Sequence, residues 1–290
     1  MGRGCCGIIS RCRLIVSEGL TFDDWGGPLG SPFLFEGGLM ALLTDGNPND
    51  TEGLRVFESA ILDVAHVEGI DLNAKLCLAT EEVSEDVLDL LLGHASHVTR
   101  RALGVSDVVV TPQMKRWQAL HTLAVVYRDA YNNQLNDRYL SKWEEYRELA
   151  RGARERTYGF GIGLVAAPIP RAGAAVMGMG AGALAGAVYY AQVSWVSATG
   201  QEGSASFATN FQTSDNSVLT VAAGNAPAVA VGWNVYLGLT VSTVTLQNSA
   251  PLGIEATFTL PGSGVVNGAS PRDGQAADMY VTGGRILRRG

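Results

Sequence analysis

The segment Tyr189-Tyr-Ala-Gln-Val-Ser-Trp-Val-Ser197 marks a change in the hydrophobic period of this 290-residue chain. Apolar and polar side chains alternate in it, as in a β-strand with one buried face. Upstream, from Thr51 onward, apolar residues recur every three or four positions, which is the period of a helix. The sequence therefore predicts an α+β multidomain protein, with an N-terminal α-helical bundle and a C-terminal all-β immunoglobulin-like sandwich.

Further strands follow this segment. Short alternating runs separated by turn residues are typical of a small sandwich of about seven strands. No cysteine is present in this region to join two sheets, so we expect the core to depend on aromatic packing, with Trp195, Trp233, Tyr236 and Phe258 inside. The predicted runs are 204–212, 218–223, 228–237, 243–247, 256–260 and 279–286.

Four helices are expected upstream. The first begins at Thr51, and the second begins at Thr80, whose hydroxyl would cap the first turn. Thr111-Pro112 begins the third, because proline lacks only an N–H that the first turn leaves unpaired. A fourth follows the polar turn at 132–136. The apolar stripes of the last two can face each other, which predicts an antiparallel helical hairpin.

The predicted domains follow these changes of period. Residues 1–50, rich in Gly, Pro and Phe, are interpreted as an extended N-terminal arm, and a loop folded over its own domain is the alternative. The helical domain takes 51–171, a Gly/Ala-rich linker 172–187, and the sandwich 188–290. The uncharged stretch 172–201 favours a hinge over a membrane span, since it is mostly Gly and Ala at first.

Charge divides the chain in the same place. Only 5 of the 28 acidic and 4 of the 21 basic residues follow Arg171. The net charge of −7 gives no general attraction for nucleic acid or an anionic membrane, so we expect no membrane partner and at most local DNA contact. Charged residues make up 17% and hydrophobic residues 47%, so we expect partners to cover part of the surface.

Residues that could perform catalysis or bind metal do not converge in the sequence. The pair His94-x-x-His97 lacks both an HExxH frame and an identifiable third ligand. The cluster Cys5-Cys6-x5-Cys12 lacks the CxxC spacing of a zinc site, and reduced thiols are the simpler interpretation. We therefore expect a protein that is not an enzyme and that uses no cofactor or metal.

Three groups of residues are candidate assembly contacts. Aromatic side chains of the arm would be costly to leave in water, so we expect them to anchor it in a neighbouring subunit. Basic residues of the fourth helix alternate with glutamates, which suits ion pairs along the helix or between subunits. Arginines of the C-terminal tail could dock on a partner. The candidates are Trp25, Phe33, Phe35, Arg138, Lys142, Arg147, Arg151, Arg288 and Arg289.

Two regions resemble proteins of tailed bacteriophages. The helical passage from Arg116 to Gln134, followed by Asn136 to Arg151, resembles head-to-tail connector proteins, or portal adaptors. The second region consists of Gly232-Trp-Asn-Val-Tyr-Leu-Gly, Leu246-Gln-Asn-Ser-Ala-Pro-Leu and Gly274-Gln-Ala-Ala-Asp-Met-Tyr-Val. It is similar to fibronectin or immunoglobulin-like modules that such phages attach to structural proteins.

The resemblance implies a structural virion protein, made in the host cytoplasm and located at the head-tail interface. It would form a homo-oligomeric, dodecameric ring at the neck that joins the portal protein to the downstream neck or tail protein. A tail, collar or baseplate protein whose sandwich binds a host surface glycan is the alternative. The arm at 1–50 matches nothing in this family, so its partner stays open.

Overall fold

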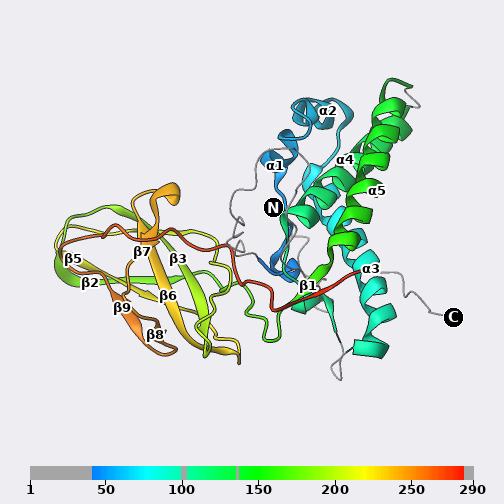
Figure 1. The fold of residues 1–290 in the computed structure, drawn as a ribbon. Coiled ribbons are helices and arrows are strands. Elements are labelled where there is room, and N and C mark those ends of the chain that lie inside the picture. The colour runs from blue at the N-terminus through cyan, green and yellow to red at the C-terminus, as the bar shows by residue number, and fades with distance from the viewer. Residues whose placement is uncertain (1–40, 99–102, 135–136, 284–290) are drawn as a thin grey trace, which may run out of the picture. The chain divides into compact units, whose positions relative to one another are not determined.

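The computed structural model describes residues 41–98, 103–134 and 137–283 of the chain (Figure 1). A helical region precedes a region of β-strands, which confirms the α+β class. Within the described residues, no helix is both long and apolar enough to cross a lipid bilayer.

The chain divides into two compact units. Among the described residues, the helical unit contains 46–166 and 277–283, and the β unit contains 41–45 and 167–276. This division differs from the predicted one in two ways. Residues 41–45, which precede the helices, belong to the β unit, and residues 277–283, which follow the sandwich strands, belong to the helical unit.

Among the described residues, the helical unit contains two short helices followed by three long ones. Its helices are α1 (Thr51–Arg55), α2 (Ile61–Glu68), α3 (Leu72–Val98), α4 (Pro112–Gln134) and α5 (Leu140–Phe160), with 3₁₀ turns η3 (Val105–Asp107) and η4 (Asp137–Tyr139). The predicted first helix is therefore two short helices, because the chain turns between α1 and α2.

The start of α3 differs from the prediction. The carboxylate of Asp71 accepts hydrogen bonds from the amides of Asn73 (2.9 Å) and Ala74 (3.2 Å), and so caps the first turn. Thr80 is buried inside the helix, where its hydroxyl donates to the carbonyl of Leu76 at 2.8 Å. The prediction of an N-cap at Thr80 was wrong because a threonine hydroxyl can also bond to the preceding turn.

Helices α4 and α5 form the predicted antiparallel hairpin (Figure 1). The hydroxyl oxygen of Thr111 accepts from the amide of Met114 at 3.0 Å, which confirms the predicted start of α4. Tyr127 stacks on Tyr146 with ring centroids 5.5 Å apart. Further pairs, Tyr131 with Trp143 and Trp117 with Tyr158, follow the same antiparallel register. Aromatic contacts therefore fix how the two helices align.

A two-stranded sheet completes the helical unit. Strand β1 (Ile162–Leu164) pairs antiparallel with β10 (Met279–Val281). The sequence placed this last strand in the sandwich. Its partner is instead β1, because a strand pattern shows that a segment is extended without showing which strand it meets.

The β unit contains two antiparallel sheets. One has the strand order β2-β5-β9 and the other β4-β3-β6-β7, and β8 also pairs with β6. The strands are β2 (Val176–Leu184), β3 (Val188–Ser197), β4 (Thr209–Gln212), β5 (Ser217–Ala222), β6 (Ala230–Gly238), β7 (Thr245–Leu246), β8 (Leu252–Gly253) and β9 (Thr257–Thr259), with 3₁₀ turns η2 (Leu43–Asp45) and η5 (Val241–Thr243).

Side chains from both sheets form one core. Trp195 and Trp233 are opposite each other on β3 and β6 and are fully buried. Leu219 of β5 belongs to the same cluster, and Phe258 of β9 packs against it. The prediction is therefore confirmed for Trp195 and Trp233, whereas Phe258 is only partly buried and Tyr236 is buried outside this cluster.

The glycine-rich segment that was expected to be a linker contains β2. Its backbone pairs with β5 from Val176 opposite Ala222 to Ala181 opposite Ser217, followed by a register shift. A Cβ added at Gly182 would lie 2.5 Å from the carbonyl oxygen of Ser217. Glycine therefore permits a close approach of two strands here, and the segment is part of a sheet.

Candidate functional site

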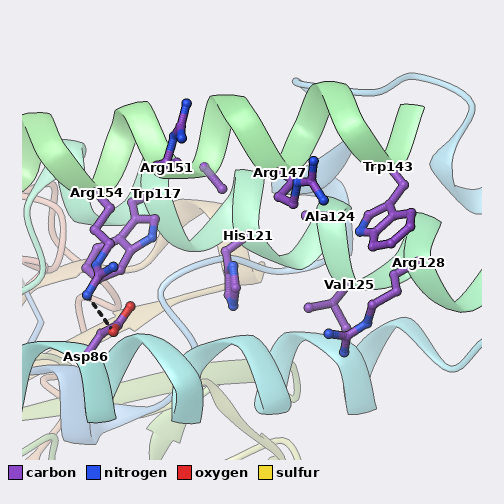
Figure 2. Close-up of a pocket in the computed structure, with 11 residues that line it drawn as sticks. Asp86, Trp117, His121, Ala124, Val125, Arg128, Trp143, Arg147, Arg151 and Arg154 are labelled. Atoms are coloured by element: carbon purple, nitrogen blue, oxygen red, sulfur yellow. Dashed lines mark hydrogen bonds and ion pairs between the residues drawn. The ribbon is translucent and has the colours of Figure 1, made fainter. Parts of the chain in front are cut away.

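A groove of about 270 Å³ lies on the helical unit, lined by one face of α4 and by residues of α3 and α5 (Figure 2). Helix α3 contributes one lining residue, and α4 and α5 contribute five each. The lining residues are Asp86, Trp117, His121, Ala124, Val125, Arg128, Trp143, Arg147, Ala150, Arg151 and Arg154.

The spacing of these residues explains why they meet. On both α4 and α5 they recur at intervals of three and four, so each set lies on one helical face. Trp117, Ala124 and Ala150 are buried and form an apolar floor. Arg147 and Arg151 are exposed at the rim on α5. The groove thus combines apolar surface with guanidinium groups that reach solvent.

Two charge pairs connect the helices across the groove. Arg154 donates to the carboxylate of Asp86 at 2.8 Å, and the imidazole of His121 lies 2.5 Å from a carboxylate oxygen of Glu82. Burial raises the pKa of Asp86, and this effect outweighs the opposing effect of Arg154. These pairs hold α3 against α4 and α5, and they engage the carboxylates of Asp86 and Glu82 beside the groove.

The positive charges of the other arginines at the groove are less fully paired with carboxylates than that of Arg154. The guanidinium carbon of Arg147 lies 5.5 Å from the ring centroid of Trp143, as expected for a cation–π contact. Arg151 pairs with Glu148, a contact that is exposed to solvent. Within the described residues, Arg147 and Arg128 form no ion pair. Guanidinium groups of this kind bind carboxylates and other oxyanions through paired hydrogen bonds.

The structure brings together two of the predicted contact residues, Arg147 and Arg151. Lys142 has another role, since its amine donates to the carboxylate of Glu58 at 2.9 Å. Arg138 lies over the ring of Tyr139, 4.5 Å from its centroid. Neither Lys142 nor Arg138 lines the groove, and Arg138 lies in η4, before α5 begins. The basic residues that the sequence placed on one helix therefore have different neighbours.

Other predicted residues cannot be placed. The side chains of His94 and His97 and the following contact candidates lie outside the described residues: Trp25, Phe33, Phe35, Arg288 and Arg289. Across the part of the chain that the structure describes, no group of His, Cys, Asp and Glu residues is arranged to hold a metal ion.

Sequence reasoning missed several residues of the groove. Trp117 and Trp143 were not among the candidate contacts; both form aromatic pairs between α4 and α5, and both also line the groove. His121 was not among the candidate contacts either; it is half-buried and paired with Glu82. The available signal was a second stripe on α4, Trp117 to Arg128 at helical spacing, in which aromatic, small and basic residues are mixed.

A buried carboxylate in the β unit has a structural role. Glu202 is 6% exposed and accepts a hydrogen bond from the hydroxyl of Tyr236 at 2.5 Å. Ser194 also donates to it, and Arg272 lies 3.8 Å away. Because several donors surround this carboxylate, it joins β3 and β6 to the loop that follows β3.

No protein-family model matches the chain, and no curated protein matches it.

Proposed function

We propose that the chain is a structural protein of a tailed-phage virion, an adaptor that forms a ring at the neck. In this proposal the helical unit binds the portal protein and the next neck or tail protein. The observation that carries it is the open groove on the α4–α5 hairpin, because its chemistry is that of a protein contact surface.

The composition of the groove supports this role. Tryptophan and arginine are enriched at protein interfaces and among the residues that contribute most to binding. Trp143, Arg147 and Arg151 lie together on α5 beside an apolar floor. The imidazole of His121, the kind of group that acid–base chemistry would use, and the guanidinium of Arg154, a possible anion ligand, are instead paired with carboxylates. The geometry therefore favours binding of another protein over catalysis.

The strand order of the β unit supports an immunoglobulin-like module. In variable-type immunoglobulin domains, strands C′, C, F and G form one sheet, and strands B and E pair in the other. The order β4-β3-β6-β7 corresponds to the first set, and β2 with β5 corresponds to the second. Trp195 then lies on the strand equivalent to C, which carries the characteristic buried tryptophan.

Two features depart from that pattern. Among the described strands, none corresponds to strand A, and β9 pairs with β5 at the position of strand D although it follows β7 in the chain. The proposed module is therefore a variant of the immunoglobulin-like sandwich. Its few charged residues are consistent with a domain that contributes to a virion surface through packing rather than through chemistry.

Electron microscopy of the full chain tests the proposed function. Negatively stained particles of the purified protein should be closed rings, and mixing with rings of the cognate portal protein should give coaxial stacks of the two. Single chains that remain unassociated in the presence of portal would contradict the proposal, as would turnover of a substrate by the purified protein.

A further inference from the structure

The outer face of α3 has a chemistry opposite to that of the groove. Glu81, Glu85, Leu88 and Leu92 recur at intervals of four, three and four, so they lie on one narrow stripe of the helix. Both glutamates are exposed, and Leu92 is 60% exposed. Within the described part of the chain, neither glutamate forms an ion pair. This acidic stripe, Glu81 to Leu92, presents carboxylates beside apolar side chains.

From this complementarity we infer that the groove receives the acidic stripe of a second copy of this chain. The inference rests on the proposed role as a ring subunit, and it names the contact between neighbouring copies. Carboxylates are the natural partners of the arginines at the rim, and leucines suit the partly exposed ring of Trp143 beside them.

The spacing of the two surfaces agrees when the helices approach in antiparallel directions. Glu81 and Glu85 are four residues apart, as are Arg147 and Arg151, and four residues of helix rise by about 6 Å. Glu81 then lies opposite Arg151, and Glu85 lies opposite Arg147. Continuing along both helices brings the leucines of the stripe to Trp143.

The contact is head-to-tail. Glu82 and Asp86 are the residues of α3 next to the groove. Each follows a glutamate of the stripe by one position, so the stripe is rotated by about 100° around α3 from the side that faces the groove. Each copy therefore offers a groove on one face and an acidic stripe on another. Repeated contacts between unlike surfaces close into a ring when the rotation between copies permits it, and otherwise extend into a filament.

A charge-reversal series in the full-length chain tests the contact. The double variants Glu81→Lys/Glu85→Lys and Arg147→Glu/Arg151→Glu place like charges against each other, and should each weaken association by about tenfold or more. Light scattering after size exclusion should show that each double variant is monomeric at concentrations where the wild type is assembled. The variant carrying all four changes restores opposite charges, and should assemble again.

Mixing gives a second measurement that does not depend on the fourfold variant. In an equimolar mixture of the two double variants, every contact between one variant and the other joins a stripe and a groove of opposite charge. Assembly should therefore return, with the two variants alternating. The matched control is Glu144→Lys/Arg156→Glu, which reverses exposed charges on α5 that do not line the groove. This control should keep the wild-type mass, and circular dichroism should show that all variants are folded.

Several results would overturn the inference. The contact is wrong if either folded double variant keeps the wild-type mass, or if the fourfold variant and the mixture both stay monomeric. Binding of a single-stranded oligonucleotide that is lost in Arg147→Glu/Arg151→Glu, with the mass unchanged, would assign the groove to nucleic acid instead. Assembly that follows the charges without binding to portal would keep this contact and reject the neck role. Rings that bind portal and whose assembly is unchanged by the charge reversals would keep the neck role and reject this contact.

Discussion

At the scale of single residues, a partly buried carboxylate in this protein joins separate elements. Glu58, in the turn between α1 and α2, accepts from the amine of Lys142 and from the hydroxyl of Tyr146, each at 2.9 Å. Burial raises the pKa of Glu58, but these hydrogen bonds outweigh burial and the net pKa is lowered. The charged carboxylate therefore joins the first turns of the unit to α5.

Replacing Glu58 by Gln should destabilise the helical unit at neutral pH by about 1–3 kcal/mol, since charge-assisted hydrogen bonds are lost. A lowered pKa means that Glu58 contributes stability above its unfolded value of 4.5, and that this stability is lost as pH falls through the folded pKa. Urea unfolding should therefore show a smaller gap between wild type and variant in acid than at pH 7. Glu52→Gln, at an exposed position, is the control; an equal gap at both pH values would contradict this account.

Tyr236 makes the corresponding bond in the β unit. Tyr236→Phe should lower the free energy of unfolding by about 1–3 kcal/mol, because the buried carboxylate of Glu202 loses a donor. Chemical denaturation followed by tryptophan fluorescence measures this. Tyr190→Phe, on the neighbouring strand β3 but partly exposed, should change little. A similar small effect of both substitutions would show that Glu202 does not depend on Tyr236.

Residue types were easier to predict from the sequence than residue partners. The alternation of bases and glutamates on α5 was visible, and from it Arg147 and Arg151 were predicted as assembly contacts. The structure shows both exposed beside the groove, and the contact itself stays a prediction. The same alternation also selected Lys142, whose partner Glu58 is distant in the sequence. Which arginine faces a groove depends on where α3 and α4 pack, and no spacing within α5 contains that information.

At the scale of elements, local signals were reliable where few alternatives competed. Thr111-Pro112 began a helix as predicted, since a threonine cap and a proline, whose missing N–H the first turn does not need, both favour a helix start. Thr80 has two possible local bonds, and the structure has the one that lies inside a helix. Glycine is equally ambiguous, because it suits both a flexible linker and a close approach of strands.

Substitution of Gly182 separates these two roles of glycine. Gly182→Ala should destabilise the β unit by about 1–3 kcal/mol, because the new Cβ would meet the backbone of Ser217. In a flexible linker the same change would be neutral or slightly stabilising. Gly180→Ala is the matched control on the same strand, since its Cβ would make an ordinary 3.5 Å contact with Val218. Urea unfolding with equal midpoints for both variants would contradict the pairing of β2 with β5.

At the scale of the whole molecule, chain order and unit membership diverge. Along the sequence, most of the β unit is inserted between two segments of the helical unit, because β10 pairs with β1. In the other direction, Asp45 precedes the helices but belongs to the β unit, where it accepts hydrogen bonds from the amide of Arg171 and the hydroxyl of Ser204. Periodicity predicted the two kinds of structure, but contacts between distant segments decide these exchanges.

The measurement that tests the central claim most directly is the mass of the full-length chain in solution by sedimentation velocity. If the protein is an assembly subunit whose groove and acidic stripe meet between copies, one discrete species containing several chains should dominate at micromolar concentration and dissociate as salt is raised. A species with the mass of one chain at every protein and salt concentration would contradict the claim.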